Sequence, residues 1–65
     1  MTICPGEQVK VQIMQHRLFE ENTILHLYFV KKYKEKDTVI LRFRETLDVF
    51  SKHYNFKANE IIVTY

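Results

Sequence analysis

Residues 24–30, ILHLYFV, are apolar apart from His26, and no other feature of the sequence limits the possible folds so strongly. A strand with one face in water alternates apolar and polar side chains, whereas this run is apolar at consecutive positions. It therefore predicts a strand over residues 23–33 with apolar side chains on both faces. A chain of 65 residues has little material with which to cover two faces of a sheet, so whatever covers them decides both fold and function.

Other segments show strand patterns of the more usual kind. Val9, Val11 and Ile13 alternate with polar residues, which is the period of two of a strand with one buried face. Polar stretches at residues 20–22 and 34–37 predict turns between the first three strands. The four expected strands span residues 8–18, 23–33, 38–44 and 61–65.

Residues 46–56 have a different period. Leu47, Phe50 and Tyr54 fall at i, i+3 and i+7, the spacing of one face of a helix, and Thr46 is an acceptable N-cap. The segment therefore predicts a short helix. The expected fold is α+β, with a single four-stranded sheet in the order β-β-β-α-β and one short helix packed on one face.

Strict alternation assigns every strand residue to one of two sheet faces. The face expected to carry the helix is apolar throughout and includes Val9, Val11, Ile13, Leu25, Leu27, Phe29, Val39, Leu41, Phe43, Ile61 and Val63. The outer face is mixed, with apolar residues in the middle of the strands and cations near their ends. We expect the first face to form the hydrophobic core.

Length and cysteine content predict one domain in a reducing compartment. A single domain is expected over residues 8–65, after a flexible lead-in over residues 1–7. Cys4 is the only cysteine, so no internal disulfide can form. No signal-peptide pattern is present, and no apolar run approaches the roughly 20 residues of a membrane helix. We expect a soluble intracellular protein, cytoplasmic or nuclear.

The order of patterns from residue 24 to residue 65 matches a known arrangement. LYFVKKYKEKDTVILRF is a hairpin, ETLDVFSKHY a crossing helix, and FKANEIIVTY a returning strand. This pattern resembles the ubiquitin-like and SUMO-like domains of β-grasp fold. The resemblance implies a non-catalytic protein-binding module that uses a sheet face or edge. The helix is short for that family and an additional strand precedes the hairpin.

One short helix covers one sheet face, so we expect a partner to cover the other. Ile24, Tyr28, Val30, Ile40 and Ile62 would form an apolar outer patch, and patches of this kind mark interfaces unless their residues are merely scattered. We predict a small non-enzymatic interaction module, an inhibitor or adaptor, that binds a protein or a second copy of itself. The expected contact residues are Met14, His26, Tyr28, Val30, Lys32, Ile40, Arg42 and Arg44.

The same face supports an alternative function, nucleic-acid binding. Cations around aromatic rings on a sheet can hold phosphates and stack bases. Glu35, Asp37 and Glu45 dilute the positive charge, and the net charge is only +2. The residues expected to serve this function are Lys10, Tyr28, Lys32, Arg42 and Arg44.

Other classes of function find little support. The spacing of His16, His26, His53 and Cys4 matches no zinc pattern, so no metal or other cofactor is expected. The single glycine, Gly6, excludes a glycine-rich phosphate loop. No nucleophile and base are placed for catalysis. We therefore predict no enzymatic activity, no small-molecule substrate and no membrane partner.

Overall fold

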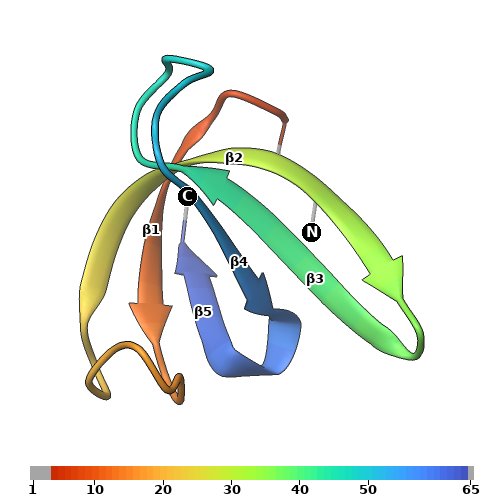
Figure 1. Ribbon diagram of the computed structural model, residues 1–65. Helices are drawn as coiled ribbons and strands as arrows, with labels where there is room; N and C mark the ends of the chain where they lie inside the picture. Colours follow the sequence, from red (N-terminus) through yellow and green to blue (C-terminus); the bar gives the residue numbers. More distant parts are fainter. Residues whose placement is uncertain (1–3, 65) are drawn as a thin grey trace.

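The computed structural model describes residues 4–64, which form five strands and one short 3-10 helix. The elements are β1 (Gln8–Ile13), β2 (Ile24–Glu35), β3 (Thr38–Arg44), β4 (His53–Lys57), η1 (Ala58–Glu60) and β5 (Ile61–Thr64). Neighbouring strands pair antiparallel in the order β4-β3-β2-β1-β5 (Figure 1). The fold is therefore nearly all-β. The expected α+β fold, with four strands and a helix on one face, is wrong.

The error lies in residues 46–56. Local polar side chains hold residues 45–52 as a loop: Thr46 Oγ1 accepts from the Asp48 backbone N–H at 3.2 Å, and Asp48 Oδ1 accepts from the Phe50 backbone N–H at 2.9 Å. Such bonds compete with helical ones. Residues 53–57 then form β4, which pairs with β3. The β-grasp architecture needs a helix across the sheet, and this segment provides none.

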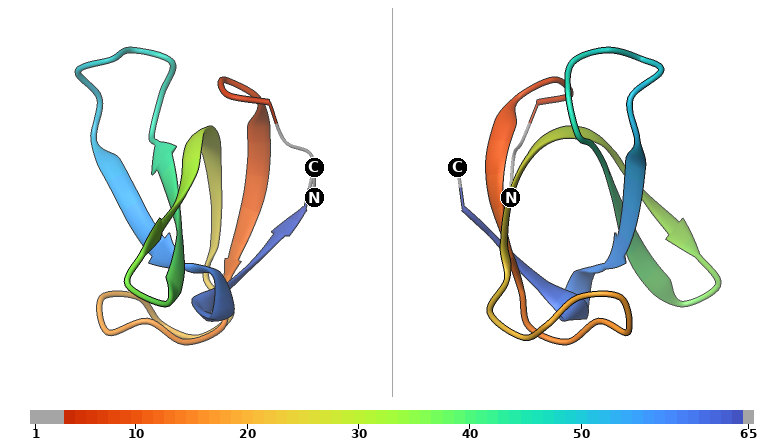
Figure 2. Two further views of the ribbon diagram at one scale, coloured as in Figure 1. Left: turned by 90° about the vertical axis from the view of Figure 1, so that its right-hand side faces the viewer. Right: turned by 60° about the vertical axis from the view of Figure 1, so that its left-hand side comes forward.

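The sheet rolls until its two edges meet at one end. β4 and β5 are the outermost strands, yet only the three residues of η1 separate them along the chain. β2 makes the roll possible, because its first half pairs with β1 and its second half with β3, with a register shift between Phe29 and Lys31. A bulge of this kind bends a strand and increases its twist. Figure 2 shows the resulting curved wall from two sides.

The inner face of this roll is the hydrophobic core. Its buried residues are Val9, Val11, Ile13, Leu27, Phe29, Leu41, Phe43, Phe56 and Ile61. Except for Phe56, all were assigned to the core face from alternation, and that assignment is confirmed. Leu25 and Val63 are partly buried against the same cluster. Phe56 joins it because β4 replaces the expected helix.

The connection between β1 and β2 closes the open end of the roll. β1 ends at Ile13, earlier than the expected residue 18, and a single bridge pairs His16 with Phe19. The Phe19 ring lies 5.8 Å from that of Phe56 and 6.1 Å from that of Tyr54, centroid to centroid. Figure 2 shows this loop crossing the end of the sheet beside η1. Curvature and this loop therefore cover the core face in place of a helix.

The start of the described chain is attached to β2. Gly6 donates its backbone N–H to the Phe29 carbonyl at 2.7 Å, and Phe29 donates to the Glu7 carbonyl at 3.0 Å. Residues 1–3 of the expected lead-in, and Tyr65 of the expected last strand, lie outside the described residues. Within residues 4–64, no helix has the length and apolar character that crossing a bilayer requires.

Candidate nucleic-acid interface

The bulge in β2 decides which lysines reach the outer face of the sheet. Side chains directly opposite each other in an antiparallel pair lie on the same face. Lys31 pairs with Arg42 and Tyr33 with Ile40, so both lie on the outer face. Lys32 pairs with the buried Leu41 and therefore belongs to the inner side, where it extends into solvent. The outer-face position expected for Lys32 is wrong, because strict alternation does not allow for a bulged residue.

Three rows of residues that pair side by side across β2, β3 and β4, here called rungs, form what we call the basic face. Its residues are Tyr28, Arg44 and His53 in the first rung, Lys31, Arg42 and Asn55 in the second, and Tyr33, Ile40 and Lys57 in the third. Four of the nine are lysine or arginine, and none is acidic. Glu35 is the acidic residue of β2, and it lies beyond these rungs, at the hairpin end opposite Thr38. The basic face therefore concentrates positive charge in a chain whose net charge is +2.

Tyr33 and Asn55 organise the centre of the basic face. The Tyr33 ring has Lys31 Nζ at 5.1 Å and the Arg42 guanidinium carbon at 5.4 Å from its centroid, both within cation–π range. Arg42 Nε donates to Asn55 Oδ1 at 2.9 Å, and the Tyr33 hydroxyl donates to the same oxygen at 3.4 Å. Since the amide oxygen accepts both bonds, the Asn55 amide nitrogen is turned outward as a donor. These contacts orient Arg42 and place the Lys31 ammonium beside the same ring.

The structure brings together half of the sequence-predicted contact residues. Tyr28, Ile40, Arg42 and Arg44 all lie on the basic face and are half-buried. The other four are dispersed: Val30 is at the bulge, Lys32 on the inner side, His26 on the β1 half of the sheet opposite Lys10, and Met14 beyond the end of β1.

The expected apolar outer patch is divided between two halves of the bent sheet. Ile24 and Ile62 both pair with Gln12, which therefore lies between them on the half formed by β2, β1 and β5. Ile40 lies on the other half, beside Tyr33 and Lys57. The polar residues between these isoleucines break the continuity on which an apolar docking face depends.

Sequence reasoning missed Lys31, Tyr33, Asn55 and Lys57 as members of this face. The last two belong to HYNFK, which alternates polar and aromatic residues with a period of two. That alternation was available as a strand signal but was overridden by the helical spacing of Leu47, Phe50 and Tyr54. For the first two residues the sequence carries no clear indication of the bulge.

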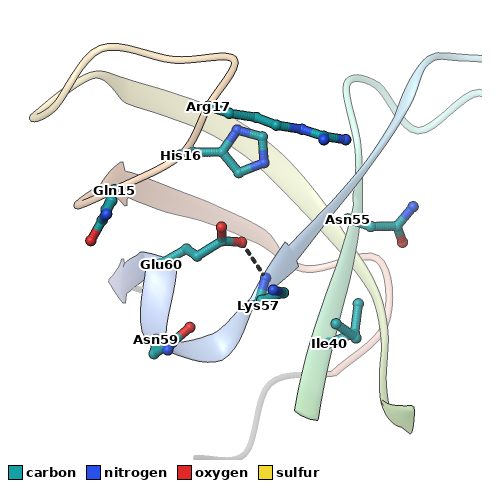
Figure 3. Close-up of a pocket in the computed structure, with 8 residues that line it drawn as sticks. All are labelled: Gln15, His16, Arg17, Ile40, Asn55, Lys57, Asn59 and Glu60. Carbon is teal, nitrogen blue, oxygen red and sulfur yellow. Dashed lines mark hydrogen bonds between the residues drawn. The ribbon is translucent and has the colours of Figure 1, made fainter. Parts of the chain in front are cut away.

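A hollow of about 660 Å³ adjoins the basic face where the β1–β2 loop approaches β4 and η1 (Figure 3). Arg17 and Gln15 come from the loop, Asn55 and Lys57 from β4, and Asn59 from η1. The Arg17 side chain extends from the loop toward Asn55 in Figure 3. The hollow shares Ile40, Asn55 and Lys57 with the basic face, so the two surfaces are continuous.

Glu60 supplies the acceptor of this hollow. One of its oxygens, Oε1, accepts from the Lys57 backbone N–H at 2.8 Å, which fixes the carboxylate over the gap between η1 and β4 (Figure 3). Backbone bonds from Met14 and Gln15 to the Glu60 carbonyl, at 2.8 and 3.2 Å, attach the loop to η1. The walls of the hollow are therefore connected by hydrogen bonds.

A second exposed feature is the loop over residues 45–52 between β3 and β4, which projects from one end of the molecule (Figure 1). Leu47, Val49 and Phe50 are 61, 62 and 92% exposed. Ser51 Oγ donates to the Thr46 carbonyl at 3.2 Å, and the Arg44 guanidinium donates to the Leu47 carbonyl at 3.2 Å. The polar groups of this loop thus bond to one another while its apolar side chains face water.

Among residues 4–64, no group of three or more histidine, cysteine, aspartate or glutamate side chains is placed to hold a metal ion. The His16 ring packs on Phe56 at 5.2 Å between centroids, and its Nδ1 accepts from the Leu18 backbone N–H at 3.1 Å. His16 therefore has a structural environment within the loop that closes the roll.

Comparison of the chain with protein-family models, with curated proteins and with solved structures finds no match. Function is therefore inferred from the geometry of the basic face, the hollow and the loop.

Proposed function

We propose that this protein is a non-enzymatic, intracellular binding module for single-stranded nucleic acid, which lies across the basic face. The observation that carries the proposal is the set of three rungs with four lysine or arginine residues and no carboxylate. Phosphates would contact Lys31, Arg42, Arg44 and Lys57. Bases would stack on the arginine and tyrosine planes, as is usual where cations and aromatic rings share a sheet.

The curvature of the sheet favours a single strand over a duplex. The basic face lies on the outer side of the rolled sheet, and the core lies on the inner side, so the basic face is convex. A stiff duplex touches a convex surface over a short length, whereas a flexible single strand can follow it. The cations around Tyr33 then meet successive phosphates without a large ordering cost.

The neighbouring lysines 31 and 32 give a matched test, because consecutive strand residues point to opposite sides of the sheet and the bulge puts Lys31 on the outer one. Fluorescence anisotropy with a labelled single-stranded DNA of about 12 nucleotides measures binding. Lys31→Glu should weaken the affinity about tenfold at low salt and reduce the slope of log affinity against log salt by about one. Lys32→Glu makes the same change of net charge and should weaken binding less than about twofold.

Equal effects of the two substitutions would show that binding follows net charge and not the basic face. An affinity that does not change between about 50 and about 200 mM salt would also contradict the proposal, since phosphate contacts release counterions. Thermal unfolding of both variants controls for loss of structure. Both side chains are exposed, so we expect their melting temperatures to stay close to that of the original chain.

A second candidate function, protein binding, has a separate observation in its favour. Phe50 is 92% exposed at the end of an internally hydrogen-bonded loop, with Leu47 and Val49 beside it. A projecting aromatic anchor fits an apolar pocket of a partner protein. Asp48 lies between these side chains, and its charge disfavours insertion into lipid. This keeps a protein partner as a candidate but moves its contact site from the sheet to the loop.

Site-specific photo-crosslinking tests the second candidate. A photoreactive phenylalanine analogue at position 50 should form one discrete adduct in the host extract, and mass spectrometry identifies its protein. That protein, purified, should bind the original chain and bind Phe50→Ser at least about tenfold more weakly, because truncating a buried aromatic anchor removes most of its contact area. An unchanged affinity, or the absence of any discrete adduct, would reject the loop as a docking site.

A further inference from the structure

We infer that the hollow beside the basic face holds one unstacked nucleotide of the bound strand, with a preference for guanine. This inference rests on the proposed function, because it assigns base selectivity to the continuation of the same surface. A hollow of about 660 Å³ falls within the usual size of small-ligand sites, roughly 300–1,000 Å³. It can therefore accept a nucleotide unit.

The hollow offers both cations for a phosphate group and an acceptor for a base. Arg17 and Lys57 are exposed cations from the loop and from β4, and both can contact a phosphate group. Arginine and lysine bind phosphate oxygens through charge-assisted hydrogen bonds. Glu60, on η1, is held against the Lys57 backbone N–H, so its carboxylate offers an acceptor for base donors close to these cations.

The Glu60 carboxylate selects among the bases. One Glu60 oxygen is committed to the Lys57 backbone N–H, so the carboxylate is held in place and its other oxygen can accept from a ligand. Guanine presents two adjacent donors, the ring N1–H and the exocyclic amino group, to such a carboxylate. Adenine and cytosine present one amino group, whereas uracil presents a single ring N3–H flanked by two carbonyl oxygens that a carboxylate disfavours. Asn59 and Gln15 also line the hollow.

Arg17 and Glu60 can be changed without touching the core. Arg17 is exposed in the loop, and the amide oxygen of Gln at position 60 can still accept the Lys57 bond. Isothermal titration with GMP, AMP, CMP and UMP measures the hollow alone. Single-stranded guanine-containing and uracil-only oligonucleotides measure it together with the basic face. Lys10→Gln, on the other half of the sheet, is the control for loss of one positive charge.

We expect GMP to bind more tightly than the other three nucleotides, and UMP least. Arg17→Gln should weaken every mononucleotide about five- to tenfold. Glu60→Gln should remove the guanine preference while leaving the affinity for the uracil-only oligonucleotide within about twofold. Amide chemical shifts should change on GMP addition at Gln15, Arg17, Lys57 and Asn59, and remain unchanged at Lys31.

The outcomes separate this inference from the proposed function. Oligonucleotide binding that depends on Lys31 but shows no base preference and no saturable GMP binding would overturn the hollow as a nucleotide site and leave the basic face standing. GMP binding that survives both Arg17→Gln and Glu60→Gln would place the nucleotide elsewhere. GMP binding with no salt-dependent oligonucleotide binding would overturn the proposed function instead.

Discussion

At the scale of single residues, two phenylalanines depart from the places that the sequence predicts for them. Phe50 was expected on the buried stripe of a helix, and it is 92% exposed at a loop tip. Phe56 was expected at the end of that helix, and it is 1% exposed in the core. Its ring contacts those of Phe43 and Phe19, at 6.1 and 5.8 Å between centroids, so it joins the sheet to the loop that closes the roll.

Truncation of these two side chains should have opposite consequences for stability. Phe56→Ala should lower the free energy of unfolding by about 3–5 kcal/mol, since it removes a fully buried ring and leaves a cavity. Phe50→Ala should change it by less than about 0.5 kcal/mol. Urea denaturation followed by circular dichroism gives both values. If Phe56→Ala does not fold, Phe56→Leu should still cost at least about 1 kcal/mol. Comparable losses at both positions would contradict this assignment of core and surface.

At the scale of elements, the β2–β3 hairpin shows where local sequence and local backbone disagree. The turn consists of Lys36 and Asp37, because Glu35 still pairs with Thr38. Lys36 has φ +57°, in the left-handed region that glycine adopts most readily. In two-residue hairpin turns the first position commonly holds glycine when only that residue has positive φ. The hairpin therefore forms despite an unfavourable residue at its turn.

Glycine at this turn should stabilise the protein. Lys36→Gly should raise the free energy of unfolding by about 0.5–1 kcal/mol, because it removes the steric cost of positive φ in an L-residue. Lys34→Gly, two residues earlier within β2, should lower it by about 0.5–1 kcal/mol, because glycine weakens a strand interior. Differential scanning calorimetry compares the two variants, which carry the same change of charge. Destabilisation by both would indicate that Lys36 makes a contact worth more than the strain.

The bulge at Val30 has a larger effect than any single side chain of β2. It lets one strand serve two halves of a bent sheet, and it exchanges the faces of all residues that follow. Without it, Val30 would pair with Arg42 and Lys32 with Ile40 on the outer face, and Tyr33 would point to the core side. The composition of the basic face is therefore a consequence of one irregularity in backbone register.

At the scale of the whole molecule, the roll of the sheet solves the problem that the apolar run 24–30 creates. Leu27 and Phe29 point into the core, which the sheet itself surrounds. Tyr28 and Val30 are only half-buried. The roll also separates charge, since it gathers Lys31, Arg42, Arg44 and Lys57 on one convex surface while the net charge is only +2.

The sequence by itself determined the elements that depend on neighbours along the chain. Alternation with a period of two identified β1, and runs of β-branched and aromatic residues identified most of β2, β3 and β5. Assigning alternate residues to opposite faces then gave the core side correctly, because consecutive strand residues point to opposite faces. Of the candidate site, it identified Tyr28, Ile40, Arg42 and Arg44, which lie on the same side of regular strand segments.

Only the tertiary structure decided the rest. The helical period of residues 46–56 overlaps the strand period of HYNFK, residues 53–57. Pairing with β3 decides for the strand, and β3 lies outside this segment. The bulge at Val30 is favoured because a sheet whose edges meet must bend, and the same bend moves Lys31 and Tyr33 to the outer face. Closure of the roll is a property of five strands together, so no local pattern along the chain specifies the surface that it creates.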